Sequence, residues 1–167
     1  MSRIMVVSGG GTGIGLAVAE AFVRDGDQVV PVGRRADVLD EAVARLGSGC
    51  ALAVPADLTD ETEAAGVRDL VAGRFGRVDV PVDNAGGNVA PGAGEPSLTE
   101  LWTGDFRSAV LTAVRGGGSG SYGAAEAALH PYACDLAADL GARGITVDVI
   151  APGFVDDTGF FGGRTTR

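Results

Sequence analysis

The sequence predicts an α/β fold, a doubly wound parallel sheet with helices on both faces. Three observations predict it. Short apolar runs alternate along the chain with segments whose apolar residues recur at helical spacing. Many of these segments end in a glycine, and the chain has 28 glycines in 167 residues. The first apolar run leads directly into a glycine-rich turn and then a helix, at residues 4–22.

The composition excludes several classes of partner. A net charge of −9 argues against nucleic acid or an anionic membrane as a partner, and no stretch is long enough to cross a bilayer. Met1 to Arg3 lead directly into the first strand, which leaves no room for a signal peptide. Cys50 and Cys134 have no ligand spacing, so we expect no metal site but two reduced, buried thiols in a cytoplasmic protein. By length, residues 1–167 form one domain.

The first unit, residues 4–26, predicts a site for a dinucleotide. Glycines lack a Cβ, so the backbone of the turn can approach a phosphate and adopt positive φ angles. The helix that follows directs its free N–H groups and its positive dipole end at the anion. A glycine-rich turn alone most often binds nothing. Between a buried strand and an amphipathic helix that ends near Gly26, it predicts dinucleotide binding.

The second strand, residues 28–32, predicts the choice of dinucleotide. In such a fold the end of this strand faces the adenosine ribose, where an acid would hold the 2′-hydroxyl and an arginine would accommodate a 2′-phosphate. Gly33 leaves space here, and Arg34 and Arg35 supply positive charge. We therefore predict NADP rather than NAD. The alternative is that the two arginines begin a helix in solvent.

The rest of the chain continues the alternation. We expect a helix that buries Leu39, Val43 and Leu46 and ends at Gly47, followed by a strand at 51–55. A helix with a capped start at 59–61 then runs to Gly76 and leads into a strand at 78–83. The last expected elements are a helix opened by a capping box at 97–100, a longer helix from Ser121 and a strand at 145–150. Pro81 lies inside the fourth strand, although proline cannot donate a ladder hydrogen bond. Pro131 interrupts the longest helix, where it should produce a kink.

Five motifs in order resemble those of the short-chain dehydrogenase/reductase family, over nearly the whole chain. Ser8 to Gly15 is similar to its Thr-Gly-x-x-x-Gly-Ile-Gly, 57–58 to its adenine-contacting pair, 83–86 to its Asn-Asn-Ala-Gly, 122–126 to its Tyr-x-x-x-Lys and 152–153 to its Pro-Gly. The resemblance implies a Rossmann-type fold. The nucleotide contacts that the motifs and the arginines imply are Gly9, Thr12, Gly13, Ile14, Gly15, Arg34, Arg35, Asp57, Leu58, Asn84, Ala85, Gly86, Pro152, Gly153 and Thr158.

The catalytic residues of the family are largely replaced. Members transfer hydride between NAD(P)(H) and a carbonyl or alcohol with an Asn-Ser-Tyr-Lys tetrad, of which this chain keeps only Tyr122. Glu126 stands at the lysine position and Ala109 at the asparagine position. Between residues 114 and 115 roughly 30 residues, including the serine and its strand, are missing relative to the family. The chain also stops soon after 160–161, where the family continues through a substrate lid and a final strand.

Three functions therefore stay open: an NADP-dependent oxidoreductase with strongly impaired activity, a nucleotide-binding or partner-binding module without turnover, and a fragment that barely folds. The sequence names no substrate. Family members usually pair through the two helices beside the gap, one of them short here, so a homo-oligomer is also open. With family strands 5 and 7 missing, we expect five parallel strands in the order 3-2-1-4-5, with Val80, Val82, Val147 and Val149 buried.

Overall fold

The computed structural model describes residues 2–86, 120–152 and 155, with side chains in the second range from Ala127 onward. The chain divides into two compact units. The first comprises Met1–Ala85 with Asp156–Arg167, and the second Gly86–Val155. Among the residues described, no helix combines the length and the apolarity that crossing a membrane requires.

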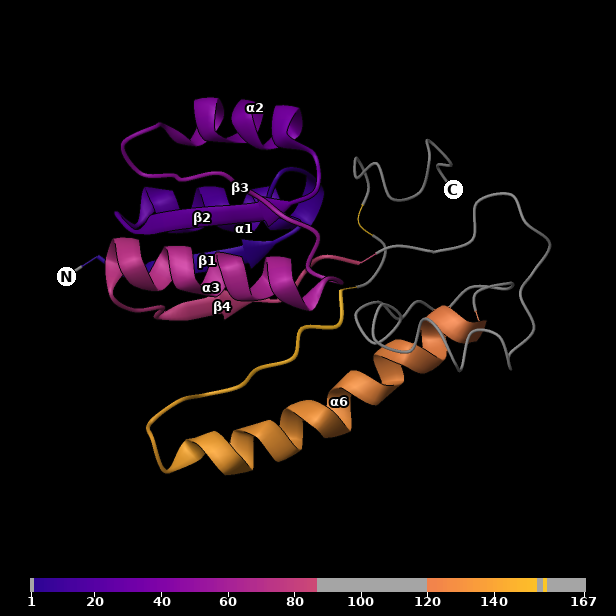
Figure 1. Cartoon of the computed structure of the whole chain (residues 1–167). Coiled ribbons are helices and arrows are strands. Elements are labelled where there is room, and N and C mark those ends of the chain that lie inside the picture. Colours follow the sequence, from indigo (N-terminus) through magenta and orange to yellow (C-terminus); the bar gives the residue numbers. More distant parts are fainter. Residues whose placement is uncertain (1, 87–119, 153–154, 156–167) are drawn as a thin grey trace. The chain divides into compact units, whose positions relative to one another are not determined.

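The first unit is a four-stranded parallel sheet in the order β3-β2-β1-β4, with helices between its strands (Figure 1). Along the chain its elements are β1 (Ile4–Ser8), α1 (Gly13–Arg24), β2 (Gln28–Gly33), α2 (Ala36–Leu46), β3 (Val54–Pro55), α3 (Glu61–Phe75) and β4 (Val80–Val82). This arrangement confirms the Rossmann-like α/β class and the predicted order of the first four strands.

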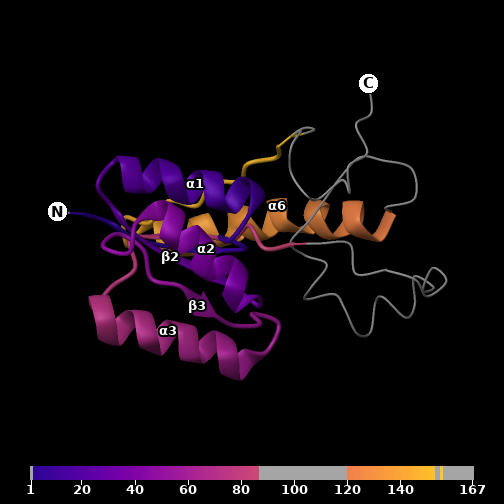
Figure 2. The ribbon, with the colours of Figure 1, turned by 90° about the horizontal axis from the view of Figure 1, so that it is seen from above.

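Two apolar layers hold the helices to the two faces of the sheet. On one face, alternate residues of β1 and β2 such as Ile4 and Val30 pack with Val67 and Val71 of α3. On the other face, Met5 and its neighbours pack with residues of α1 and with Leu46 of α2. Because successive side chains of a strand point to opposite faces, one short apolar strand supplies both layers. Figure 2 shows α1 and α3 on opposite sides of the sheet.

The predicted ends of the helices are confirmed. Gly26, Gly47 and Gly76 follow α1, α2 and α3 with φ angles of 88°, 97° and 76°, a region that side chains disfavour. Asp60 caps α3, since its Oδ1 accepts hydrogen bonds from the N–H groups of Thr62 and Glu63 at 2.7 and 3.1 Å. These signals are local, and local signals suffice to stop a helix.

Two prolines shorten the outer strands. Asp79 N donates to Ile4 O at 2.9 Å, so Pro81, two residues later, occupies the position whose N–H would face β1. Val29 N donates to Cys50 O at 2.8 Å, so Pro31 likewise faces β3 without a donor. As a result β4 spans only Val80–Val82 and β3 only Val54–Pro55, while Ala51 pairs with Val29 of β2 in a separate bridge.

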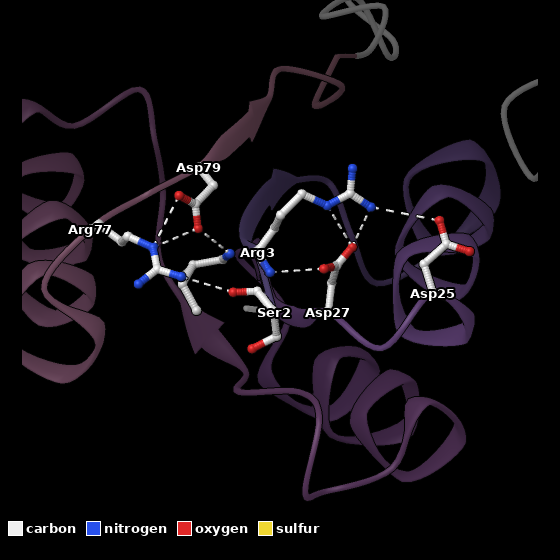
Figure 3. Close-up of polar contacts among 7 residues, drawn as sticks. Ser2, Arg3, Asp25, Asp27, Arg77 and Asp79 are labelled. Atoms are coloured by element: carbon white, nitrogen blue, oxygen red, sulfur yellow. Dashed lines mark hydrogen bonds and ion pairs between the residues drawn. The ribbon is translucent and has the colours of Figure 1, made fainter.

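The amino end of the sheet is fixed by two arginine–aspartate pairs (Figure 3). Arg3 donates from its backbone N and its Nε to the carboxylate of Asp27, at 2.8 and 2.9 Å. Asp79 accepts from Ile4 N at 2.7 Å and from Arg77 Nε at 2.9 Å. The Arg3 guanidinium lowers the pKa of Asp27, and the Ile4 N–H, followed by Arg77, lowers the pKa of Asp79. The bonds of Arg3 to Asp27 tie the start of β1 to that of β2, and the bond from Ile4 N to Asp79 ties it to that of β4.

The second unit contains α6 (Gly120–Gly141), which continues through Pro131. Two predictions are wrong here. Residues 145–150 form no strand, and Val149 and Ile150 are 47% and 85% exposed. A strand needs a paired neighbour, and its expected partner β4 is three residues long with a central proline. The second wrong prediction is the burial of the two thiols, since Cys134 is exposed and Cys50, in the first unit between α2 and β3, is only half-buried.

Other burial predictions are only partly met. Val80 and Val82 are half-buried rather than buried, since β4 lies at the edge of the described sheet, and Val147, in the segment that forms no strand, is half-buried as well. The helix predicted from residue 97 lies outside the described residues.

Candidate nucleotide-binding site

The glycine-rich turn joins β1 to α1 at the carboxyl end of the sheet. Gly9 and Gly13 have φ angles of 65° and 55°, which other residues rarely adopt. Gly9 N donates to Val32 O at 2.8 Å, which ties the turn to β2. The turn therefore leaves β1 at a fixed angle and places the start of α1 above the ends of the strands.

Two glycines of this turn have no space for a side chain. A Cβ on Gly15 would lie 2.5 Å from both Gly9 O and Asn84 Nδ2. A Cβ on Gly10 would lie 2.6 Å from Val7 Cγ1 and 2.8 Å from Pro31 Cβ. The backbone of the turn is thus packed directly on the strand ends.

Ser8, the last residue of β1, links the turn to the segment after β4. Its Oγ accepts hydrogen bonds from Asn84 N and Ala85 N, both at 2.9 Å. Its backbone O accepts from Asn84 Nδ2 at 3.0 Å. The predicted motifs at 8–15 and 83–86 are therefore joined in the structure, at Gly9, Gly15, Asn84 and Ala85.

The N-terminus of α1 is available to an anion. Thr12 is the N-cap residue in an extended conformation, and its side chain makes no capping hydrogen bond. Thr12, Gly13 and Ile14 are exposed. The first N–H groups of a helix have no partner within it, so a phosphate fits here as their acceptor. The site suits the pyrophosphate of a dinucleotide on this ground as well as on the packing of Gly9 and Gly15.

Charged residues follow the next two strands. Arg34 and Arg35 are exposed between β2 and α2, and Arg35 is the N-cap residue of α2 without a capping bond. Asp57 follows β3, and its Oδ1 accepts hydrogen bonds from Thr59 Oγ1 and Thr59 N at 2.7 and 3.0 Å. The Thr59 hydroxyl, with a smaller effect of the Arg34 charge, lowers the pKa of Asp57. Arg34 and Asp57 therefore share one end of the site.

Of the remaining predicted residues, Leu58 belongs to the first unit, and Gly86, Pro152, Tyr122 and Glu126 belong to the second. Leu58 and Gly86 are exposed, and Pro152 is exposed in the second unit. Tyr122 and Glu126 lie one turn apart near the start of α6, in the part whose side chains are not described. Gly153, Thr158 and Ala109 lie outside the described residues. Within the described residues, no three His, Cys, Asp or Glu side chains gather as a metal site requires.

Sequence reasoning missed two supports of the turn. The Asn84 side chain bonds Ser8 O, and Pro31 lies under Gly10. A signal for the first was present, because Ser8 and Asn84 are polar residues at the carboxyl ends of two apolar strands. No local sequence pattern predicts that Pro31 lies under Gly10.

The chain is similar to many proteins of one family. A sequence model described as short chain dehydrogenase matches residues 3–116. An uncharacterized oxidoreductase of Methylorubrum extorquens is 32% identical over 182 positions, which cover 92% of this chain and 73% of the relative. The 7alpha-hydroxysteroid dehydrogenase of Escherichia coli is 30% identical over an alignment that covers 92% of this chain and 71% of the relative. Momilactone A synthase of Oryza sativa is 28% identical, and this chain covers 66% of its length.

The alignment with the Methylorubrum relative also shows that this chain lacks residues that the relative has. It has 182 positions, whereas 92% of the 167 residues is about 154, so about 28 positions have no counterpart in this chain. The family match ends at residue 116, within two residues of the predicted gap.

Solved structures agree with the sequence relatives. A short-chain dehydrogenase from Streptomyces avermitilis superposes with a TM-score of 0.82 at 29% identity, with 96% of this chain and 68% of that chain covered. RhlG of Pseudomonas aeruginosa, in a complex with NADP, gives a TM-score of 0.75 at 27% identity, with 90% and 72% covered. Sequence motifs, fold and relatives together show that this chain belongs to the short-chain dehydrogenase family of oxidoreductases.

Proposed function

We propose that this chain binds NADP(H) at the turn between β1 and α1 and that its hydride transfer is strongly impaired. One observation carries the binding proposal. The turn is closed against the strand ends by Ser8 and Asn84, while the N-terminus of α1 has no side-chain cap. A rigid backbone cradle with free N–H groups is what a pyrophosphate requires.

The preference for NADP rests on the end of β2. Arg34 and Arg35 are exposed there, and a Cβ on Gly33 would meet only Leu39 Cδ2, at 3.8 Å, so the strand end is open. A 2′-phosphate would accept charge-assisted hydrogen bonds from a guanidinium. Two relatives support this choice by their names. They are RhlG in its NADP complex and the NADP-dependent alcohol dehydrogenase of Lentilactobacillus kefiri, which is 38% identical over 60% of this chain.

The proposal that activity is impaired rests on Tyr122 and Glu126. When bound, NADPH supplies a hydride to a carbonyl carbon, and Tyr122 would then give a proton to the carbonyl oxygen. A lysine ammonium one turn away favours the phenolate that remains, whereas the carboxylate of Glu126 disfavours it. At about 5 Å and an effective dielectric constant near 20, this reversal amounts to roughly 3 kcal/mol per charge. The absence of about 28 aligned positions supports the loss of the serine segment as well.

A second candidate is a nucleotide-binding or partner-binding module without turnover. The same two observations favour it, because the turn stays intact while the catalytic positions have changed. Both candidates require nucleotide binding, and they differ only in turnover. A fragment that barely folds would show neither nucleotide binding nor turnover.

Titration of purified protein with NADPH and with NADH tests binding. We expect NADPH to bind more tightly and Arg34→Ala to weaken NADPH binding by about 10- to 150-fold with little effect on NADH, since one charge-assisted hydrogen bond contributes about 1.5–3 kcal/mol. Arg24→Ala is the matched control, because Arg24 is an exposed arginine at the other end of α1. Equal affinities of the parent chain for the two cofactors would contradict the role of Arg34.

Turnover is tested by NADPH oxidation with a panel of aldehydes and ketones. We expect rates no higher than in a reaction without protein, and the same rates for Tyr122→Phe. Glu126→Lys alone should restore little, because tetrad members act as a unit. Clear turnover by the parent chain that disappears in Tyr122→Phe would refute the impairment while leaving the binding proposal intact.

A further inference from the structure

A thiol and an imidazole lie side by side on α6, in the second unit. Cys134 Sγ is 3.9 Å from His130 Nδ1, within hydrogen-bond distance for sulfur. The two residues are four apart, so they lie on one face of the helix, and both are exposed. The proposed nucleotide site uses neither of them.

The pair is distinct from the other cysteine of the chain. Cys50 is half-buried in the segment between α2 and β3, whereas Cys134 is exposed. His130 is the only histidine, and the chain has only two cysteines. An exposed thiol beside a group that accepts protons near neutral pH has both requirements of a nucleophile, namely access and a base.

We propose that Cys134 is a modification site that undergoes thiol–disulfide exchange with low-molecular-weight disulfides, with His130 as its base. His130 Nδ1 takes the proton of the Cys134 thiol, and the thiolate attacks one sulfur of the disulfide. A new S–S bond forms at Cys134 as the original S–S bond breaks. The departing thiolate then takes a proton from the imidazolium or from water. Cys134 is oxidised and the small disulfide is reduced, so no further oxidant is needed.

Neighbouring charges determine which disulfide fits. Asp135 and Asp139 are exposed on the same helix, and the whole chain has a net charge of −9. Their negative charges repel an anionic reagent and act against the Cys134 thiolate. A neutral disulfide such as bis(2-hydroxyethyl) disulfide is therefore the suitable probe, and glutathione disulfide, which is anionic, should react more slowly.

The size of the effect is bounded by the thiolate population. An ordinary thiol is a few per cent thiolate at pH 7, so complete proton transfer to a base raises that population by at most about 30-fold. A more stable thiolate is also a weaker nucleophile, with a Brønsted coefficient of about 0.4–0.5. The expected net acceleration by His130 is therefore about 3- to 10-fold.

The test uses Cys50→Ser, which leaves Cys134 as the only thiol. Its second-order rate constant with bis(2-hydroxyethyl) disulfide at pH 7 should fall about 3- to 10-fold when His130→Gln is added. Asp135→Asn is the matched control, because it changes a neighbouring charge and should alter the rate by the same factor with or without His130. Equal rates with and without His130 would overturn the proposal.

A second measurement does not depend on His130→Gln, which could change the rate by unfolding α6 rather than by removing the base. Because His130 is the only histidine, its ring protons give one set of NMR signals in the chain that carries Cys50→Ser. Because His130 Nδ1 lies 3.9 Å from Cys134 Sγ, the chemical shifts of these ring protons should change when Cys134→Ser is added and when Cys134 is modified. Unchanged chemical shifts in both cases would also overturn the proposal. NADPH binding is independent of both results, so the two proposals can fail separately.

Discussion

Replacing Gly15 by alanine tests how the nucleotide turn is held. The new Cβ would lie 2.5 Å from Gly9 O and from Asn84 Nδ2, where ordinary contacts lie at 3.4–4 Å. The Asn84 side chain can rotate away only by giving up its 3.0 Å bond to Ser8 O. Gly9 O belongs to the backbone, so it moves only if the turn moves.

Three contributions determine the expected change in stability. Overpacking costs about 1–3 kcal/mol, and loss of the Asn84–Ser8 hydrogen bond costs about 0.5–1.5 kcal/mol. Against these, alanine is favoured over glycine within a helix by about 0.8–1 kcal/mol. We therefore expect Gly15→Ala to lower the free energy of unfolding by about 0.5–3.5 kcal/mol and to weaken NADPH binding.

Urea unfolding followed by circular dichroism measures the first effect, and NADPH titration the second. Gly66→Ala is the matched control, because Gly66 lies in α3 and a Cβ there would meet no atom within 4 Å. The same exchange should stabilise the protein by about 0.8–1 kcal/mol at that position. If Gly15→Ala were as stable as Gly66→Ala, the close packing of the turn on Asn84 would be wrong.

The remaining predictions concern stability. Gly73→Ala, also without atoms near its Cβ in α3, should raise the free energy of unfolding by about 0.8–1 kcal/mol in urea; a loss would show that the helix is packed there. Asp60→Ala removes two capping hydrogen bonds and should cost about 0.5–2 kcal/mol, whereas Asp60→Asn should cost much less; equal losses would argue against the cap. Asp27 has a lowered pKa in the folded state because of Arg3, so its contribution to stability is present above the ordinary carboxyl pKa, about 3.9, and is lost as the pH falls below it. Urea unfolding from pH 7 to 3 should thus show a smaller loss for Asp27→Asn than for the parent chain, and parallel curves would contradict this.

The first half of the chain could be predicted because its signals are local. Glycines at 26, 47 and 76 end helices through their own backbone conformation, and Asp60 caps α3 through bonds to residues two and three positions away. β1 is a short continuous apolar run, which is typical of a strand buried on both faces of a parallel sheet. Each of these features depends on a few consecutive residues, which a sequence displays directly.

The contacts that complete the site depend on distant residues. Ser8 and Asn84 are 76 positions apart. Their polar side chains at the ends of two apolar strands indicate that they lie close together, but the sequence does not specify which hydrogen bonds join them. Pro31 could be seen in the sequence, but its place beneath Gly10 depends on the register of β2 against β1. Residues 145–150 have the composition of a strand, yet a strand also needs a neighbour, and composition does not reveal that β4 would be only three residues long.

The interrupted pairing beside Pro31 of β2, which leaves β3 only two residues long, gives the site two ends of unequal stiffness. The phosphate end is held by the buried strands β1 and β2, whereas Asp57 and Leu58 follow a two-residue strand. In amide hydrogen exchange, residues 52–58 should therefore open through local fluctuations and exchange early, while β1 and β2 exchange only with global unfolding. A nucleotide bound across both ends would slow exchange chiefly at 52–58, so the adenine end would bear most of the entropic cost of binding.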